Sequence, residues 1–485
     1  MKRTWWAVLL VCAMLLALLA GCGGQASAPA DGGGEEAASE EEQAASPEES
    51  GEEAAAPDAF PCQLIGTVTD GGQVVSSMII DFGESRKADG VDTETFTVHA
   101  AASTEEFLSG TDIESYGDYD IDRAIVKTET EGQTVVLYFD ETEGQTLAYT
   151  SGARNIPAVL TYTVTQNKPF TLTAADGTVL DEAFTGTYFC DNIVFDPETS
   201  QFESVYVEGG INYRFYAPEG GADTLVVWFH GNGEGDLLQS NNNAAQMLAN
   251  RGTVAWASEE FQEILGGAYV MAFQAPDTWY YAQRDGLLDQ AAAEINDVVT
   301  QNGINPDRIL VSGCSAGGYM TTRMIIAHPD LFCAAMINCP AYDVADSRGG
   351  ETPTDEELAA VKASGVPIWL VQGREDSVVA TAECSQRLFN ILSEGQEVTE
   401  TEVTQEHPET SDFTTYETPD GLYKLSLYDL NDEGLLRVAE DYDQDGVLSE
   451  ATYSSHFSWV YTLLNNPQAA DGTHIVNWAA AIANG

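Results

Sequence analysis

Ser315 has the residue pattern of a nucleophile. It stands between two glycines in Gly313-Cys-Ser-Ala-Gly317. The apolar run Ile309–Val311 before it predicts a buried strand, and the residues from Tyr319 to about Ala327 predict a helix. In such a strand-to-helix turn the glycines allow a close backbone approach that a Cβ would block, and the serine hydroxyl projects beyond the strand. We therefore predict that Ser315 attacks a carbonyl carbon close to the free N–H groups at the helix start.

A serine nucleophile needs a base within hydrogen-bond reach and a carboxylate that orients the base. The apolar run Ile368–Val371 predicts another strand, and the turn after it carries Glu375 and Asp376. Spacing alone does not separate two adjacent acids. We predict Asp376 as the acid and keep Glu375 as the alternative.

Three histidines follow the acid in the chain, where the base is expected. His407 lies in a polar stretch, and His474 lies near the end of the sequence. His456 lies in Ser-Ser-His-Phe-Ser-Trp, on a loop that enters an apolar helix. We predict His456 as the base; the alternative is a surface histidine at a helix start.

A glycine-rich turn after the apolar strand Leu225–Phe229 occupies the place of an oxyanion-hole loop. We predict that the backbone N–H groups of Asn232 and Ala316 stabilise the oxyanion. The ring of His230 precedes the nucleophile in the chain and is expected to brace this loop. A phosphate-binding loop is disfavoured because no Gly-Lys-Ser/Thr follows. The loop residues in this prediction are His230, Gly231 and Gly233.

Residues 201–485 alternate strands and helices, which would position these groups. Leu225–Phe229 and Tyr269–Phe273 are apolar throughout, and Leu287–Val299 has apolar residues three and four apart. Strands without polar alternation are buried on both faces, and their alternation with helices indicates a mostly parallel sheet. We predict an α/β domain here, with residues 394–450 as a less regular acidic excursion.

Residues 59–200 have a different pattern. Short runs rich in Val, Thr, Ile, Tyr and Phe are separated by turn clusters such as Asp70-Gly-Gly and Asp176-Gly. Short strands at this spacing predict an all-β antiparallel sandwich. A chain of this length is too long for one ordinary core, so two domains are expected.

The beginning of the sequence has the features of an export signal. Residues 1–22 contain Lys2-Arg3, an apolar run and Leu-Ala-Gly-Cys22, which resembles a bacterial lipobox. We predict that Cys22 is lipidated and that the protein is exported and anchored to the outer side of the cell membrane; a cleaved soluble signal or an uncleaved anchor is the alternative. Residues 23–58 are mainly Gly, Ala, Ser, Pro and acidic residues, with no aromatic and no basic residue, which predicts a disordered acidic linker.

The charge limits the partners. The chain has 19 basic and 78 acidic residues and a net charge of −59. Nucleic acid and an anionic lipid surface would be repelled, so the lipid anchor is the expected membrane contact. A neutral or cationic substrate is favoured. The oligomeric state is not readable from the sequence.

Four features of the sequence together resemble bacterial α/β-hydrolases of the esterase and polyhydroxybutyrate-depolymerase-like kind, often called predicted peptidases. They are the strand followed by His-Gly-x-Gly-Glu, the Gly-Cys-Ser-Ala-Gly-Gly-Tyr turn, the acid after Gly373 and the histidine in His-Phe-Ser-Trp. The resemblance begins near Ser204. It implies a secreted serine esterase, with Ser315, Asp376 and His456 as nucleophile, acid and base. Some relatives carry an immunoglobulin-like domain in front, which fits residues 59–200.

The sequence leaves the roles of one aromatic pair and two cysteine pairs open. Trp279 and Tyr280 follow a strand end and either line the substrate pocket or pack in the core. The cysteine pairs Cys62–Cys190 and Cys314–Cys339 are candidates for disulfides, although the six cysteines that remain after Cys12 of the signal and the lipidated Cys22 allow fifteen pairings.

One acidic turn resembles the start of an EF-hand loop. Its twelfth position is Thr452, not the glutamate that such loops use as a bidentate ligand. We expect no required cofactor, and calcium in this turn stays an option of low weight. The candidate ligands are Asp441, Asp443 and Asp445.

Three functions compete. The first is a lipid-anchored serine hydrolase that cleaves a small or carbohydrate-linked carboxylic ester. The second is a serine peptidase of the prolyl-oligopeptidase kind, which usually carries a β-propeller that about 140 residues cannot form. The third is a non-catalytic surface binding lipoprotein, which would be expected to lack one of the three catalytic groups.

Overall fold

The computed structural model describes residues 59–238, 240–440 and 447–485. Two separate hydrophobic cores lie within these residues, one among the strands of the N-terminal part and one around the large sheet that follows. The predicted lipid anchor at Cys22, the linker and the calcium-loop residues 441–446 lie outside the described residues. No helix within the described ranges is long and apolar enough to cross a membrane.

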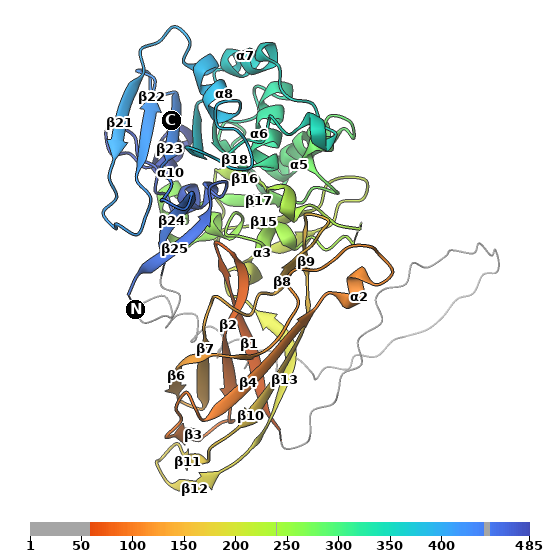
Figure 1. Cartoon of the computed structure of the whole chain (residues 1–485), viewed down its shortest axis with the longest axis vertical. Helices are drawn as coiled ribbons and strands as arrows, with labels where there is room; N and C mark the ends of the chain where they lie inside the picture. The colour runs from red at the N-terminus through yellow and green to blue at the C-terminus, as the bar shows by residue number, and fades with distance from the viewer. Residues whose placement is uncertain (1–58, 239, 441–446) are drawn as a thin grey trace, which may run out of the picture. The chain divides into compact units, whose positions relative to one another are not determined.

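The N-terminal part is an all-β sandwich, as predicted, but it is not wholly antiparallel, because the strands Ala59–Thr69 (β1) and Thr187–Phe195 (β13) pair in parallel (Figure 1). Its largest sheet has the order β13-β1-β2-β7-β6, and two three-stranded sheets have the orders β10-β4-β5 and β12-β11-β3. A short helix, α2 (Glu105–Leu108), interrupts the strands and was not predicted. The strands are β1 (Ala59–Thr69), β2 (Gly72–Asp81), β3 (Arg86–Asp89), β4 (Phe96–Ser103), β5 (Tyr119–Arg123), β6 (Ile125–Glu131), β7 (Thr134–Phe139), β8 (Leu147–Tyr149), β9 (Asn155–Pro157), β10 (Val159–Gln166), β11 (Phe170–Ala174), β12 (Val179–Phe184) and β13 (Thr187–Phe195).

Side-chain alternation explains how the sandwich forms. Along β1 every second residue from Cys62 to Val68 is buried, so one face of the strand packs inward. Phe82 lies in the centre of this core, with its ring edge-on to Phe170 at a centroid distance of 5.5 Å. Most of this apolar face packs within the sandwich. Val68, at the end of β1, instead belongs to the core of the large sheet.

The C-terminal part contains a ten-stranded sheet with the order β14-β15-β17-β16-β18-β19-β20-β23-β22-β21. The strands from β17 to β23 in this order are parallel, as predicted for an α/β domain. The strands are β14 (Glu203–Val205), β15 (Tyr213–Tyr216), β16 (Leu225–Phe229), β17 (Tyr269–Phe273), β18 (Ile309–Cys314), β19 (Ala334–Asn338), β20 (Ile368–Gly373), β21 (Thr399–Val403), β22 (Phe413–Glu417) and β23 (Tyr423–Tyr428).

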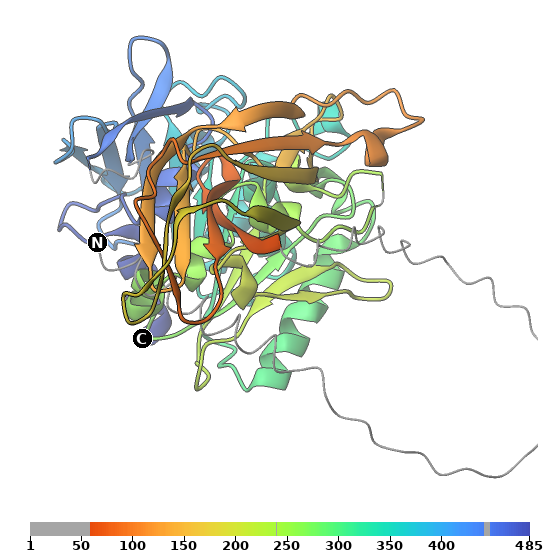
Figure 2. The ribbon, with the colours of Figure 1, turned by 90° about the horizontal axis from the view of Figure 1, so that it is seen from below.

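Helices cover this sheet in two groups (Figures 1 and 2). Helices α5, α6, α7 and α8 contact one another in succession, and α6 also packs on β16, β18 and β19. Helix α10 packs on β18, β19 and α4. The helices are α3 (Ala245–Leu248), α4 (Glu259–Leu265), α5 (Leu287–Asn302), α6 (Ala316–Ala327), α7 (Asp355–Ser364), α8 (Ser385–Leu392), α9 (Trp459–Leu463) and α10 (Ile475–Asn484).

The acidic excursion is more regular than its composition suggests. Its first part supplies β21, β22 and β23, and β23 pairs in parallel with β20. Its second part supplies the hairpin of β24 (Leu435–Glu440) and β25 (Ser449–Ser454), which ends just before His456. The excursion therefore extends the sheet and leads into the predicted base.

The two disulfides considered from the sequence are absent, because all six cysteines within the described residues are free thiols. Cys62 and Cys190 lie opposite each other on parallel strands. Neighbouring strands are about 4.8 Å apart, whereas a disulfide needs Cβ atoms about 3.8 Å apart. Cys314 is in register with Asn338, so Cys339, one residue further along, faces the other side of the sheet.

Candidate active site

The turn at Ser315 has the close strand-to-helix geometry that the sequence predicted, and its backbone is strained. Ser315 joins β18 to α6 with φ 55° and ψ −117°, in the left-handed half of backbone space. The neighbouring glycine is sterically required, since a Cβ on Gly317 would lie 1.9 Å from the carbonyl oxygen of Phe229. The serine N–H donates to the carbonyl of Asn338 at 3.0 Å. The backbone on both sides thus fixes the direction of the hydroxyl.

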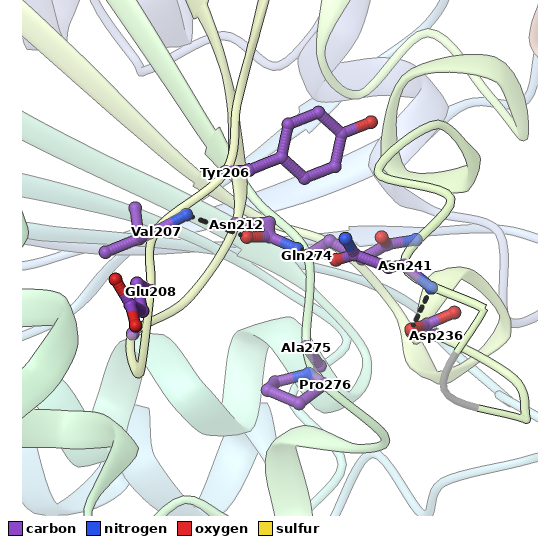
Figure 3. A pocket seen from close by; sticks show the side chains of 10 residues that line it. Tyr206, Val207, Glu208, Asn212, Asp236, Asn241, Gln274, Ala275 and Pro276 are labelled. Atoms are coloured by element: carbon purple, nitrogen blue, oxygen red, sulfur yellow. Dashed lines mark hydrogen bonds between the residues drawn. The ribbon is translucent and has the colours of Figure 1, made fainter. Parts of the chain in front are cut away.

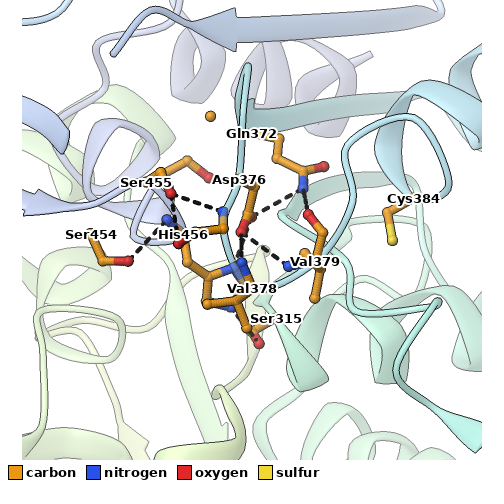
Figure 4. Close-up of polar contacts among 12 residues, drawn as sticks. Ser315, Gln372, Asp376, Val378, Val379, Cys384, Ser454, Ser455 and His456 are labelled. Carbon is orange, nitrogen blue, oxygen red and sulfur yellow. Dashed lines mark hydrogen bonds and ion pairs between the residues drawn. The ribbon is translucent and has the colours of Figure 1, made fainter. Parts of the chain in front are cut away.

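A hydrogen-bonded chain joins Ser315, His456 and Asp376 (Figure 4). The distance from Ser315 Oγ to His456 Nε2 is 2.8 Å, and that from His456 Nδ1 to Asp376 Oδ2 is 2.8 Å. Since a carboxylate accepts, the Nδ1 proton points to Asp376 and Nε2 is left to accept the serine proton. The three residues predicted as nucleophile, base and acid therefore lie together in the required order.

Asp376 is held by its own turn (Figure 4). Its carboxylate accepts hydrogen bonds from the N–H groups of Val378 and Val379 at 2.8 and 3.1 Å, and from the side-chain amide of Gln372 at 3.1 Å. The side chain is fully buried. The alternative acid, Glu375, is exposed to solvent. Four hydrogen-bond donors, one of them His456, therefore bind the carboxylate of Asp376, which favours Asp376 over Glu375 as the acid.

His456 lies on the loop between β25 and α9. The neighbouring Ser455 accepts a hydrogen bond from the N–H of Ser377 at 2.9 Å, which ties this loop to the turn of the acid. The other downstream histidines are elsewhere: His474 Nδ1 lies 2.6 Å from the carbonyl of Asn465, and His407 belongs to the loop between β21 and β22.

The two predicted oxyanion donors occupy equivalent local positions. Ala316 is the first residue of α6, and Asn232 is the first residue of the short 3₁₀ helix η2 (Asn232–Glu234). The first N–H groups of a helix have no partner within the helix. Gly231 and Ser315 are close, because a Cβ on Gly231 would lie 3.7 Å from that of Ser315. Asn232 follows Gly231 and Ala316 follows Ser315, so both predicted donors belong to residues next to this close approach.

His230 braces the oxyanion loop, as predicted. Its Nε2 accepts a hydrogen bond from the N–H of Ala275 at 2.9 Å, so its Nδ1 carries the proton and donates to the carbonyl of Gly231. Burial lowers the pKa of His230 to about 3, and the ring stays neutral. It also packs on Trp279 at a centroid distance of 5.1 Å.

The sandwich contributes contacts that sequence reasoning missed. Arg154, in the turn between β8 and β9, forms a 2.8 Å ion pair with Asp277 and donates to its carbonyl oxygen at 3.1 Å. The side-chain amide of Asn155 donates to the carbonyl of Gly233 at 3.3 Å. These partners lie 123 and 78 residues away, and no local pattern links them. A basic residue in a turn of a strongly acidic chain was the one available signal.

A cavity of about 520 Å³ opens at Ser315 and His456. Tyr280 lines it, as one reading of the sequence predicted. Trp279 does not line it, because this side chain is fully buried and packs edge-on against Phe229 in the core. The lining residues are Gly71, Tyr149, Ala153, Asn155, Gly231, Asn232, Gly233, Glu234, Ala249, Asn250, Tyr280, Ser315, Val344, Arg348, Val378, Val379, His456, Phe457 and Trp459.

A second cavity of about 400 Å³ lies beside the β14–β15 connection (Figure 3). Its lining includes Glu208, Asp236 and Asn241. Neither Ser315 nor His456 reaches it, so the candidate chemistry belongs to the first cavity.

Two buried ionisable groups surround the nucleophile. Burial raises the pKa of Glu234, at the end of η2, to about 7. Burial also raises the pKa of the Cys339 thiol well above its ordinary value. Cys339 Sγ lies within 4.8 Å of ligand atoms of Asp376 and His456. Because these two residues already bond each other, we assign no resident metal to this group.

Comparisons with known proteins agree with this architecture. A model described as the prolyl oligopeptidase family matches residues 277–357, which include the serine turn. A model described as the esterase Ig-like N-terminal domain matches residues 62–181. The crystal structure of a thermostable esterase superposes with a TM-score of 0.59 at 22% identity, over 83% of this chain and 96% of that one.

Two curated relatives are more distant. A probable chloroplastic glutamyl endopeptidase from Oryza sativa subsp. japonica is 29% identical over 120 residues, which are 22% of this chain and 13% of that protein. The uncharacterized protein YfhR from Escherichia coli O157:H7 is 24% identical over 230 residues, which are 43% of this chain and 74% of that protein. The chain therefore has an α/β-hydrolase fold whose serine turn lies in a segment similar to the prolyl oligopeptidase family, preceded by a domain similar to the esterase Ig-like N-terminal domain.

Proposed function

We propose that the protein is a serine hydrolase that cleaves carboxylic esters through an acyl-enzyme. The observation that carries this proposal is the pair of 2.8 Å hydrogen bonds from Ser315 through His456 to Asp376, at the mouth of a cavity of about 520 Å³. A volume of this size suits a small ester or the ester end of a carbohydrate-linked substrate.

The geometry supports a two-step reaction. His456 Nε2 takes the proton of Ser315 as Oγ attacks the ester carbonyl, and Asp376 stabilises the imidazolium that forms. The N–H groups of Asn232 and Ala316 donate to the oxyanion. The imidazolium then gives its proton to the leaving alcohol, and water, activated by His456, releases the acid. Each step uses groups of this chain, so activity should survive EDTA; a loss on chelation would point to a calcium site at residues 441–446.

Ester hydrolysis is tested with p-nitrophenyl acetate. Ser315→Ala should lower kcat by roughly 10⁴- to 10⁶-fold, because the nucleophile acts as a unit with its base. Equal rates for the two proteins would contradict the proposal and favour a non-catalytic binding protein. Peptidyl p-nitroanilides cover the peptidase alternative, which the prolyl oligopeptidase match supports. A higher kcat/KM on anilides than on matched esters would favour that alternative.

We also propose that the enzyme is exported and lipid-anchored through Cys22. The lipobox-like Leu-Ala-Gly-Cys and the acidic stretch after it support this location. Cys22→Ser should move the protein from the membrane fraction to the soluble fraction. A variant that stays with the membrane would contradict the anchor.

A further inference from the structure

The candidate cavity has an unusual charge for this chain. Its lining contains one basic residue, Arg348, and one acidic residue, Glu234. Because Glu234 is neutral below about pH 7, the permanent charge on the cavity wall is positive, although the chain as a whole carries −59. The net charge favours a neutral or cationic substrate, and the cavity itself favours an anionic one.

Arg348 lacks the protein partners that most basic residues here have. Of 17 lysines and arginines in the described residues, 11 form ion pairs with acidic groups. Within that part of the chain, the guanidinium of Arg348 forms no ion pair or hydrogen bond and lies over the ring of Tyr280, 5.9 Å from its centroid. Because Arg348 is unpaired in a chain with so many acids, the N–H donors of its guanidinium are available for a ligand.

The acids nearest in sequence are engaged with other groups. Asp343 accepts hydrogen bonds from the N–H of Ala380 at 2.9 Å and from the thiol of Cys384 at 3.4 Å. Asp346, in the same 3₁₀ turn as Arg348, accepts from the N–H of Thr352 at 2.7 Å. Asp343 is thereby bound to the connection between β20 and α8, and Asp346 to the backbone of its own loop. Glu351 accepts from the side-chain amide of Gln283 at 3.3 Å. The contacts therefore leave the arginine directed at the cavity, where Tyr280 supports it.

We propose that Arg348 binds a carboxylate of the substrate, and that the enzyme prefers esters that carry a negative charge over neutral esters of the same size. A guanidinium binds a carboxylate through two parallel hydrogen bonds, which gives direction as well as charge. Arg348 is exposed at the cavity wall. It would therefore contact the part of the substrate that lies away from the ester group. This inference rests on the proposed ester hydrolysis and specifies its substrate class.

The test compares two matched substrate pairs, because the carboxylate belongs either to the acyl group or to the alcohol. Monoethyl adipate is compared with ethyl hexanoate, and 4-(acetoxymethyl)benzoate with benzyl acetate. We expect kcat/KM of the wild type to be about tenfold higher for the anionic member of at least one pair, the size of one charged hydrogen bond at an exposed site. Added salt should reduce this preference.

Arg348→Gln should abolish the preference, measured as the ratio of kcat/KM for the anionic ester to that for its neutral partner, through a higher KM for the anionic ester, and Arg348→Lys should restore part of it. Arg284→Gln is the matched control, since Arg284 stacks on Tyr281, pairs with Asp285 and does not line the cavity. Equal kcat/KM within both pairs, or a preference that survives Arg348→Gln, would overturn the proposal while neutral-ester hydrolysis still upholds the proposed function.

A binding measurement keeps the two proposals separate if no ester is hydrolysed. Calorimetric titration of monoethyl adipate and of 4-(acetoxymethyl)benzoate into Ser315→Ala protein should show, for at least one of the two esters, binding that Ser315→Ala/Arg348→Gln protein loses. Equal binding to both proteins would overturn the assignment of Arg348, whatever the outcome of the rate assays.

Discussion

The site is built from two glycine-rich turns that are held in different ways. The serine turn, Gly313–Gly317, contacts the sheet that carries it: Ser315 bonds to the strand beside it, and Gly317 packs on the end of β16. The predicted oxyanion loop, His230–Gly235, is held in addition by Asn155 of the sandwich, which bonds to Gly233, while Arg154 of the sandwich binds Asp277, whose carbonyl lies against Gly235. The contacts of the serine turn lie within its own domain, and those of the predicted oxyanion loop include another domain.

This difference predicts different responses to mutation. Damage to the serine turn should affect folding of the large sheet, because its neighbours are backbone atoms that cannot move independently. Damage to the sandwich contacts should leave the sheet folded and loosen the loop. Four substitutions test the comparison.

The largest effect is expected for Gly317→Ala. The new Cβ would lie 1.9 Å from the carbonyl oxygen of Phe229 and 2.5 Å from that of His230, so strand and helix would have to separate. We expect a loss of at least about 4 kcal/mol in the free energy of unfolding, measured by urea denaturation, or no soluble protein. Gly71→Ala is the control, since its nearest contact would be an ordinary 3.7 Å. Near-wild-type stability of Gly317→Ala would contradict a steric role.

Arg154→Ala should have the next largest effect and act on the loop. The arginine side chain is 9% exposed, and its removal leaves the carbonyl of Asp277 without its donors. We expect a loss of about 3 kcal/mol in unfolding free energy, because the buried guanidinium gives two hydrogen bonds to that carbonyl, together with a lower kcat on p-nitrophenyl acetate. Arg86→Ala, on the sandwich strand β3, is the control. An unchanged kcat in a fully folded Arg154→Ala variant would show that the loop keeps its conformation without this arginine.

Much of the serine turn was predictable from the sequence, and the reason is local. The predicted strand limits Leu225–Phe229 and Tyr269–Phe273 are those of β16 and β17. Short runs made only of apolar residues are typical of strands in a sheet that is buried on both faces. The glycines around Ser315 indicate that the neighbouring atoms leave no room for a Cβ at these positions. Helix α7 was missed, although Thr354 and Glu357 form a capping box at its start.

The support of the oxyanion loop was not predictable, because its partners lie in the other domain. Nothing near Asn155 in the chain indicates a bond to Gly233, and nothing near Trp279 shows that its ring packs on Phe229 instead of facing the cavity. Such contacts depend on how two separately patterned regions meet. A single sequence constrains each region and leaves their contact open.

A third substitution, Glu234→Gln, tests the loop through pH. The folded-state pKa of Glu234 is raised from 4.5 to about 7 by burial, so the folded protein favours the protonated acid. This favourable contribution is complete below about pH 4.5 and is lost as pH rises to about 7. Glutamine imitates the protonated acid at every pH. The variant should match the wild type at pH 4.5 and exceed its unfolding free energy by about 2–3 kcal/mol at pH 8. An equal difference at both pH values would contradict the assignment.

The smallest and most specific effect is expected for Asn155→Ala. The substitution removes one 3.3 Å hydrogen bond to the carbonyl of Gly233, next to the N–H group that is to hold the oxyanion. A neutral hydrogen bond contributes about 1 kcal/mol, so kcat on p-nitrophenyl acetate should fall roughly fivefold with KM and the urea midpoint little changed. Asn167→Ala, which removes a side-chain bond to Thr97 elsewhere in the sandwich, is the matched control. If Asn155→Ala raises KM and leaves kcat intact, the sandwich binds substrate at this point and does not position the loop.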